Sequence, residues 1–285
     1  MKKILITGAN SYVGTSFEKW LSQWPDEYHV DTIDMIDGIW REKSFAGYDV
    51  VFHVAGIAHV KETKENEHVY YKVNRDLAFE AARKAKMDGV SLFIFLSSMS
   101  VYGLLTGTIT KETIPIPRTN YGKSKLEAEH LIFKLLDDRF KVAILRPPMI
   151  YGKGCKGNYP KLSALVKKIR VFPKIENRRS MVYVENLCDF IQQIIESATM
   201  SSGIFFPQNS EYVDSSSLVS VIASVNNVKI IISKVFIPLA YFVKITKPTI
   251  YYKVFGDLLY GKDTYSIGSY KRQIIFEESI RRTEQ

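Results

Sequence analysis

The sequence is poor in cysteine, and it lacks the clusters that bind metals. Cys155 and Cys188 are the two cysteines in 285 residues. Two cysteines cannot build a disulfide framework, and reduced thiols in a cytosolic protein are the simpler interpretation. No cysteine or carboxylate set joins His53 and His59 at ligand spacing, so we expect no metal site. The sequence also contains no visible repeat and no low-complexity segment.

Long apolar runs are absent as well. The N-terminal stretch MKKILITGAN reaches Gly8 after only a few apolar residues, so we expect no secretion signal and a cytoplasmic protein. The most apolar later segment, 235–245, contains Pro238 and Lys244 and is too short to cross a bilayer. We therefore expect no integral membrane segment. We interpret 235–245 as part of the core, and a peripheral membrane contact stays open as the alternative.

The positive charge is not gathered into runs. Lysine and arginine number 39 against 30 acidic residues, giving a net charge of +9. No run of five or six basic residues occurs. This pattern favours a phosphate-bearing small ligand and gives little support to nucleic acid as a partner. We therefore expect no nucleic-acid partner.

What the sequence does contain is an alternation of short apolar strands and amphipathic helices. This alternation indicates an α/β fold with a parallel sheet covered on both faces. Only 14 residues separate Asp34 from Asp49, too few for a helix–strand–helix insertion. We therefore expect the first half of the sheet to be abbreviated by one strand. The expected strands are 3–8, 28–35, 48–56, 90–98 and 140–148, and the expected helices are 11–24, 66–89 and 121–138.

After about residue 150 the alternation becomes irregular. Helical patterns remain at 159–169 and 184–197. We predict a dinucleotide-binding domain over 1–150 and a smaller substrate lobe over 151–285. Segments of this lobe are expected to return to the main sheet.

The stretch ITGANSYVG follows the first strand and opens a helix. Gly8 permits a tight turn, and Gly14 lets the helix pack closely on the strand, as a pyrophosphate site at a helix N-terminus requires. Asp34 lies at the end of the next strand, where a carboxylate binds a ribose diol and repels a 2′-phosphate, which favours NAD over NADP. Because the motif is short, a turn with glycines for steric reasons stays open. The candidate cofactor-binding residues of this loop are Gly8, Asn10, Ser11, Tyr12, Val13 and Gly14.

NYGKSKLEAEH places Tyr121 and Lys125 four residues apart, on one face of a helix. A phenol titrates near 10, and a nearby ammonium group favours the phenolate, so the two can form an acid–base pair. Ser98 ends a buried strand, where its hydroxyl can bind a substrate oxygen that gains charge. Ser97 and Ser100 are neighbours that could take its place. A strand-end hydroxyl that only caps backbone groups is the structural alternative for Ser98.

These motifs together resemble the extended short-chain dehydrogenase/reductase family of sugar-nucleotide epimerases, dehydratases and reductases. TGANSYVG resembles its TGxxGxxG loop, with Ser11 in place of the middle glycine. The other resembling stretches, in order, are FHVAGIAH, SSMSVYG, YGKSK, LRPPMIYG and RRSMVYVENL. The resemblance implies a Rossmann-type doubly wound parallel sheet, a smaller C-terminal substrate lobe, and NAD or NADP as cofactor.

The resemblance also implies roles for individual residues. Ser98, Tyr121 and Lys125 would be catalytic, with Lys125 binding the nicotinamide ribose. Asn74 would brace the sheet and the active-site helix. Further cofactor contacts would come from Val54, Ala55, Gly56 and Pro148, and substrate contacts from Ser98, Ser100, Asn158 and Arg179.

Two departures from the family pattern narrow the reaction. Family dehydratases carry an Asp-Glu pair after the catalytic hydroxyl, where this sequence has Met99 and Ser100, which leaves redox chemistry at the sugar C4. An asparagine that contacts the substrate diphosphate in family epimerases aligns with Met149, and Asn158 is the candidate to replace it. Arg179 aligns with the diphosphate-binding arginine. Arg178, Lys161 and Lys271 are interpreted as surface charges.

The leading hypothesis is an NAD(P)H-dependent reductase. It would reduce the C4 ketone of a UDP-4-keto-6-deoxy-N-acetylhexosamine in surface-polysaccharide precursor synthesis. The alternative is a UDP-hexose or N-acetylhexosamine 4-epimerase with tightly bound NAD. A non-catalytic, redox-sensing regulator is a third reading, against which the retained Ser98, Tyr121 and Lys125 argue. The apolar positions of 66–88 and 121–138 fit either a homodimer bundle or ordinary core-facing stripes.

Overall fold

The computed structural model describes residues 1–58, 60–197, 202–264 and 273–285. His59 and Lys271, both considered above, lie outside the described residues. The chain divides into two compact units. Unit 1 comprises Met1–Gly103, Ile114–Pro147 and Cys188–Pro207, and unit 2 comprises Leu104–Thr113, Pro148–Leu187 and Gln208–Gln285. The domain boundary after residue 150 stays a prediction.

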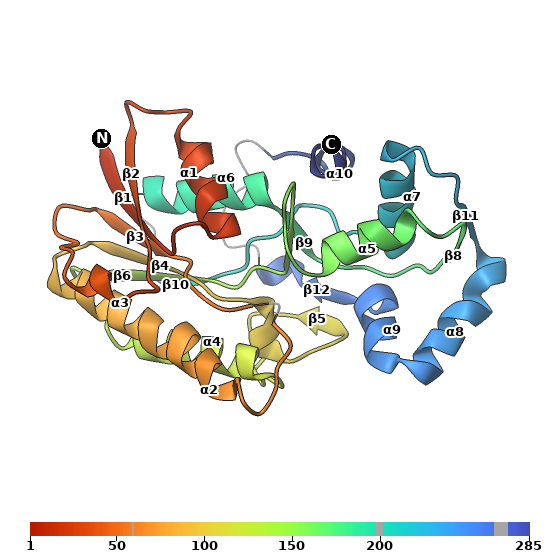
Figure 1. The fold of residues 1–285 in the computed structure, drawn as a ribbon, viewed down its shortest axis with the longest axis horizontal. Helices are drawn as coiled ribbons and strands as arrows, with labels where there is room; N and C mark the ends of the chain where they lie inside the picture. Colours follow the sequence, from red (N-terminus) through yellow and green to blue (C-terminus); the bar gives the residue numbers. More distant parts are fainter. Residues whose placement is uncertain (59, 198–201, 265–272) are drawn as a thin grey trace. The chain divides into compact units, whose positions relative to one another are not determined.

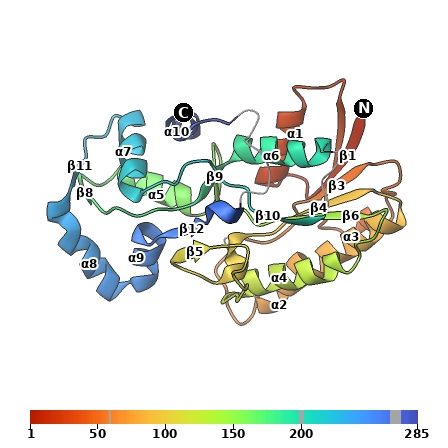
Figure 2. The ribbon, with the colours of Figure 1, turned by 180° about the vertical axis from the view of Figure 1, so that it is seen from behind.

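Unit 1 is built on a six-stranded sheet of order β10-β6-β4-β3-β1-β2 in which all neighbouring strands are parallel. Figure 1 shows α1 and α6 on one face of this sheet and α3 and α4 on the other, and the opposite view in Figure 2 agrees. This is the predicted Rossmann-type doubly wound fold. The strands are β1 (Lys2–Thr7), β2 (Tyr28–Ile33), β3 (Val50–His53), β4 (Leu92–Leu96), β6 (Lys141–Leu145) and β10 (Gly203–Phe205).

The predicted abbreviation of the sheet is confirmed. β2 lies at the edge beside β1, and the chain then crosses directly to β3 on the other side of β1. The connection contains a single 3₁₀ turn, η1 (Ile39–Arg41). Met35, Trp40 and Phe45 from this connection are buried in the core cluster, so large side chains fill the space that a helix would otherwise cover.

The predicted helices of unit 1 are also present. They are α1 (Tyr12–Leu21), α2 (Glu67–Tyr70), α3 (Leu77–Met87), α4 (Asn120–Phe133) and α6 (Val184–Glu196), the last of which starts in unit 2. A π-helical segment, η2 (Tyr71–Asp76), joins α2 to α3, so the single helix predicted over 66–89 contains a local change of winding. Ala78, Ala81, Ala82 and Ala85 are fully buried and pack in the same core cluster as Ala128 and Ile132 of α4. These stripes face the core, and the homodimer stays a prediction.

Unit 2 contains three short parallel ladders, β12-β5, β7-β9 and β11-β8. Their strands are β5 (Gly107–Ile109), β7 (Met149–Tyr151), β8 (Val171–Pro173), β9 (Met181–Tyr183), β11 (Ile231–Ser233) and β12 (Leu258–Tyr260). The helices are α5 (Asn158–Val166), α7 (Ser215–Val225), α8 (Ile237–Thr246), α9 (Pro248–Phe255) and α10 (Phe276–Glu284), with 3₁₀ turns η4 (Lys234–Phe236) and η5 (Lys262–Thr264). The helices predicted at 159–169 and 184–197 correspond to α5 and α6.

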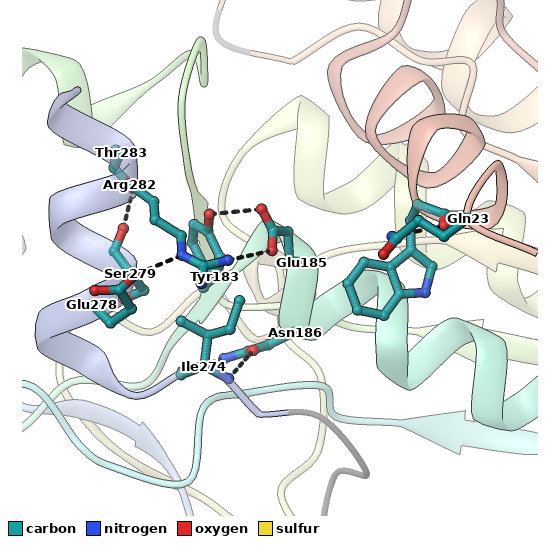
Figure 3. A network of polar contacts seen from close by, with 10 residues as sticks. Gln23, Tyr183, Glu185, Asn186, Ile274, Glu278, Ser279, Arg282 and Thr283 are labelled. Carbon is teal, nitrogen blue, oxygen red and sulfur yellow. Dashed lines mark hydrogen bonds and ion pairs between the residues drawn. The ribbon is translucent and has the colours of Figure 1, made fainter.

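Polar contacts fasten α10 within unit 2. Figure 3 shows Arg282 between two carboxylates, 2.8 Å from Glu278 Oε1 and 3.2 Å from Glu185 Oε2. Tyr183 Oη donates to Glu185 Oε1 at 3.0 Å. Asn186 exchanges two hydrogen bonds with the backbone of Ile274. The start of α6 is thereby tied to the segment that leads into α10.

The interpretation of 235–245 as core is wrong. Ala240 is the buried residue of α8, whereas Leu239, Phe242 and Ile245 are 58%, 66% and 82% exposed. No helix among the described residues is long and apolar enough to cross a membrane.

Candidate active site

The loop between β1 and α1 is shaped by two glycines. Gly8 has a φ of +116°, and a Cβ on it would lie 2.7 Å from the backbone nitrogen of Ala55. A Cβ on Gly14 would lie 2.5 Å from Ser11 Oγ and 3.0 Å from Val54 Cγ2. Asn10 also adopts a left-handed φ of 62°, which asparagine tolerates better than most residues. The loop after β1 therefore packs directly against the loop after β3.

Ser11 caps helix α1. Its Oγ accepts a hydrogen bond from Gly14 N at 3.2 Å, and its φ of −73° is open to any residue. The backbone therefore does not require glycine here, and the hydroxyl stabilises the helix end. Tyr12 and Val13 form the first helical residues. The positive end of α1 points out of the carboxyl edge of the sheet, as anion binding requires.

Asp34 directly follows β2 and is exposed. Its Oδ1 accepts a hydrogen bond from Ile36 N at 2.9 Å. The Asp34 carboxylate thus stabilises the turn that follows β2 through Oδ1, and Oδ2 can accept hydrogen bonds from other groups. Its predicted contact with a ribose stays a prediction.

His53 ends β3 as a buried, neutral side chain. Its Nδ1 lies 2.8 Å from Thr7 Oγ1, and its ring stacks near Phe93 and Phe95. Burial, with a smaller effect from the charge of Lys125, lowers the pKa of His53 to about 3. This side chain joins β1 to β3. Among the described residues no group of three or more His, Cys, Asp or Glu could hold a metal ion.

Asn74 braces the segment after β3. Its Oδ1 accepts from Ile57 N at 2.9 Å, and its Nδ2 donates to Ile57 O at 3.1 Å and to Ser124 Oγ at 3.2 Å. A Cβ on Gly56 would lie 2.9 Å from Asn74 Oδ1 and 3.2 Å from Lys125 Nζ. Asn74 therefore joins this segment to α4 as expected. Its place in the π-helical segment η2 fits the frequency of such segments at functional sites.

The structure brings Ser98 and Tyr121 together. Ser98 follows β4, and its side chain lies close enough to the Tyr121 phenol at the start of α4 to affect its titration. Burial raises the pKa of Tyr121, and the neighbouring Ser98 hydroxyl opposes this rise. Ser98 Oγ also donates to Ser100 Oγ at 3.1 Å. A phenol with a raised pKa keeps its proton at neutral pH and can donate it.

Lys125 lies one helical turn after Tyr121. Its Nζ donates to Leu96 O at 2.8 Å and lies 4.6 Å from the centre of the Phe95 ring. Burial lowers the pKa of Lys125 to about 8, and the charge of Glu129 acts in the opposite direction. The predicted effect of its ammonium group on the phenol stays a prediction.

Glu129 was not singled out from the sequence. It lies one further turn along α4 and is 1% exposed. It pairs with Arg146, whose Nη2 lies 2.5 Å from Glu129 Oε2, and it accepts a hydrogen bond from Ser97 Oγ. Ser97 is therefore engaged in this network, which leaves Ser98 and Ser100 as the available hydroxyls. The four-residue spacing of Tyr121, Lys125 and Glu129 could have revealed the third member.

Glu62 was missed as well. Its carboxylate accepts from Asn120 N at 3.0 Å and from Tyr121 N at 3.1 Å. A carboxylate at this end of a helix satisfies free N–H groups and complements the helix dipole. Glu62 thus helps to hold the start of α4, where Tyr121 lies.

The remaining candidates belong to unit 2. Pro148 is buried, and Asn158 is exposed as the first residue of α5. Arg179 Nη1 donates to Tyr252 O at 3.1 Å and to Gly256 O at 2.7 Å. Burial lowers the pKa of Arg179. Its guanidinium therefore already binds backbone carbonyls, and its contact with a diphosphate stays a prediction.

Comparison with known proteins places this geometry in a family. The chain is 33% identical over 247 residues to a UDP-glucose 4-epimerase of Vibrio cholerae, covering 78% of this chain and 75% of the relative. It is 25% identical over 228 residues to the N-acetyl-alpha-D-glucosaminyl-diphospho-ditrans,octacis-undecaprenol 4-epimerase of Escherichia coli O157:H7, covering 74% and 67%.

The fold is shared with solved structures. A UDP-glucuronic acid 4-epimerase from Bacillus cereus, in complex with NAD, superimposes with a TM-score of 0.76 at 17% identity, covering 99% of this chain and 97% of the other. Residues 4–205 match the family model described as NAD dependent epimerase/dehydratase family. The chain has a strand–glycine loop–helix unit, and Ser98, Tyr121 and the buried Lys125 lie near one edge of the same sheet. It belongs to the NAD dependent epimerase/dehydratase family.

Proposed function

We propose that the chain catalyses NAD(P)-dependent oxidation and reduction at C4 of a diphosphate-linked sugar. The observation that carries the proposal is the proximity of the Ser98 hydroxyl to the Tyr121 phenol, with Lys125 buried one turn farther along α4. A phenol, a hydroxyl and an ammonium group near the carboxyl ends of β3 and β4 suit proton transfer to or from a sugar oxygen.

The loop residues fit a dinucleotide. Gly8 and Gly14 let the β1–α1 loop pack closely against Ala55 and Val54, and α1 begins in this loop with its positive end. Asp34 supports NAD over NADP through a ribose diol. NAD(P), when bound, supplies and accepts the hydride at C4. Gly56 and Lys125 Nζ are close neighbours, since a Cβ on Gly56 would lie 3.2 Å from Lys125 Nζ. We assign both residues to the nicotinamide end of the cofactor.

The roles of the chain's own residues follow. Tyr121 would give its proton to the C4 oxygen in reduction and take it back in oxidation. Ser98 would donate a hydrogen bond to that oxygen as it gains charge. Met99 and Ser100 supply no carboxyl groups next to Ser98, so elimination of water from the sugar lacks its acid and base.

Two forms of this chemistry are supported by different observations. A phenol that carries its proton at neutral pH and lies beside Ser98 can donate that proton to a ketone oxygen, as a reductase of a UDP-4-keto-6-deoxy-N-acetylhexosamine requires. The 33% identity to a UDP-glucose 4-epimerase supports a 4-epimerase that retains NAD. A 4-epimerase acting on an undecaprenyl diphosphate sugar is the activity of another relative, so the group that carries the sugar can be a nucleotide or a polyprenol.

A product assay separates these forms. The purified chain is given UDP-glucose, UDP-N-acetylglucosamine, undecaprenyl-diphospho-N-acetylglucosamine, or a UDP-4-keto-6-deoxy sugar with NADH or NADPH. A C4 epimer formed without added reduced cofactor supports the epimerase. Oxidation of NADH or NADPH, matched by loss of the ketone, supports the reductase. No product from any of these substrates would refute the proposed activity.

A further inference from the structure

A helical hairpin in unit 2 exposes large apolar side chains. Helices α8 and α9 contact each other, and Figure 1 shows them meeting at one end in a V. On α8, Leu239, Phe242 and Ile245 follow one another at three-residue steps and are 58%, 66% and 82% exposed. Val235 before α8 and Ile250 on α9 are 78% and 50% exposed. Large apolar side chains that gather, exposed, on two adjoining helices indicate an interaction surface.

The hairpin is weakly integrated into the core. Within α8 the buried residue is Ala240, and α9 has no buried residue. The exposed large residues therefore do not stabilise the unit by packing inside it. Their exposure carries a cost in water that a partner would remove.

The charge of the hairpin has one sign. From Lys229 to Gly256 the sequence contains five lysines and no aspartate or glutamate. Glu176 has an oxygen 4.0 Å from Lys234 Nζ, and both side chains are largely exposed. Asp257 follows the hairpin and accepts a hydrogen bond from Arg178 N.

The aromatic residues show how lysine and apolar groups share this surface. Lys244 Nζ lies 5.7 Å from the centre of the Tyr241 ring and 5.5 Å from that of Tyr251. Such side chains place an apolar body below and a polar tip above, which suits the boundary between lipid tails and headgroups.

We propose that the α8–α9 hairpin docks on an anionic phospholipid surface. The apolar face of α8, with Leu239, Phe242 and Ile245, would lie among the outer parts of the acyl chains, and the lysines would meet the lipid phosphates. A helix of 10 residues is about 15 Å long, so it lies in the interface and does not span the bilayer. A second copy of the chain is the poorer occupant, because a symmetric contact would bring the three lysines of one hairpin, Lys244, Lys247 and Lys253, against those of the other.

The test uses the full chain and vesicles, without substrate or cofactor. Sedimentation is compared for vesicles of phosphatidylcholine alone and of phosphatidylcholine mixed with phosphatidylglycerol. We expect binding to the mixed vesicles that weakens as salt is raised. Reversing two exposed lysines, Lys247→Glu with Lys253→Glu, should weaken binding about 25-fold or more, at roughly fivefold for each charge removed. Phe242→Ser with Ile245→Ser should weaken it about tenfold or more.

Matched controls lie on unit 1. Met87→Ser removes a side chain that is 78% exposed, and Lys43→Glu reverses an exposed lysine; both should bind as the parent chain does. No binding to mixed vesicles, equal binding to both vesicle types, or a dimer in solution that the hairpin variants dissolve would each overturn the proposal. Because no reaction is measured, absence of activity on any sugar leaves this result unaffected.

Discussion

Tyr121 is the residue whose substitution tests the chemistry most directly. Its phenol lies beside the Ser98 hydroxyl, and its backbone N–H is held by Glu62. We expect Tyr121→Phe to lower turnover about 10²- to 10⁴-fold, because the proton donor is lost. NAD(P) affinity should change little, since the ring and the glycine loop remain. Steady-state rates and a cofactor titration provide the measurement.

The control for this variant is Tyr70→Phe. Tyr70 is a buried neighbour that influences Tyr121, and its phenol donates to Val60 O at 2.9 Å. The Tyr70→Phe variant should retain most of the activity of the parent chain. Equal rates for Tyr121→Phe and the parent chain would remove Tyr121 from the mechanism.

Glu129 should set the pH range over which Lys125 is charged. The pKa of Lys125 is lowered to about 8 by burial and supported by Glu129. If catalysis needs the charged ammonium group of Lys125, turnover falls as pH rises past about 8, because the Lys125 amine loses its proton. Glu129→Gln removes the supporting charge and should move this fall to lower pH. A pH profile of turnover measures the shift.

Ser97→Ala is the matched control for Glu129→Gln. It removes another partner of Glu129 and leaves the carboxylate charge in place. In Ser97→Ala, turnover should fall at the same alkaline pH as in the parent chain. Glu129→Gln also leaves Arg146 without its buried partner, so its stability should drop. A profile of unchanged shape in Glu129→Gln would show that Glu129 acts on structure alone.

Residues at a fixed helical spacing could be predicted from the sequence, and distant ones could not. Tyr121 and Lys125 were found because four residues make about one turn of a helix. Glu129 continues the same spacing and could have been included. Glu62 lies 58 residues before Asn120, and its contact depends on how a loop folds back. No local pattern carries that information.

At the scale of elements, the cap of α1 gives a prediction. Ser11→Ala removes the hydrogen bond from Gly14 N and should lower the free energy of unfolding by about 1 kcal/mol. Urea denaturation measures it. Asp214→Ala removes the comparable cap of α7, where Asp214 Oδ1 accepts from Ser217 N at 2.8 Å.

The two caps differ in their place relative to the cofactor loop. Asp214→Ala should cost a similar free energy and leave NAD(P) affinity unchanged, because α7 belongs to unit 2. Ser11→Ala should change NAD(P) affinity, since the freed Gly14 N–H faces the predicted pyrophosphate site. Identical NAD(P) affinities for both variants would contradict the assignment of this loop.

The loss of one strand from the first half of the sheet could be predicted, whereas β10, the π-helical winding and the exposure of α8 could not. The short connection between Asp34 and Asp49 limits what fits between β2 and β3, so counting residues was enough. The π-helical turn over Tyr71–Asp76 has no marker in the apolar spacing. The hydrophobicity of 235–245 predicted burial. Hydrophobicity alone does not tell whether the rest of the protein or a lipid surface covers these side chains.

At the scale of the whole molecule, His53 should make unfolding depend on pH. The ordinary pKa of histidine is about 6.5, and burial lowers it to about 3 in the folded chain. Between these values the unfolded chain binds a proton that the folded chain does not. The stabilising contribution is therefore complete above about 6.5 and is lost as pH falls toward 3, by at most about 1.4 kcal/mol per pH unit.

Urea denaturation at about pH 7.5 and about pH 5 measures this loss. His53→Gln should reduce the difference between the two conditions. His29→Gln is the control, because His29 is exposed and pairs with Asp31 at 2.9 Å. An undiminished difference in His53→Gln would show that other groups account for the acid sensitivity.

Helix α4 carries the proposed proton donor Tyr121, the buried Lys125 and the buried Glu129 in successive turns. Because a helix is rigid along its axis, a displacement at one end also moves the other end. A slide or tilt caused at its far end, for instance by shortening Ile132 in the core, would therefore shift all three groups in concert. Rate and pH response should then change together, although the substitution lies almost three turns from the phenol.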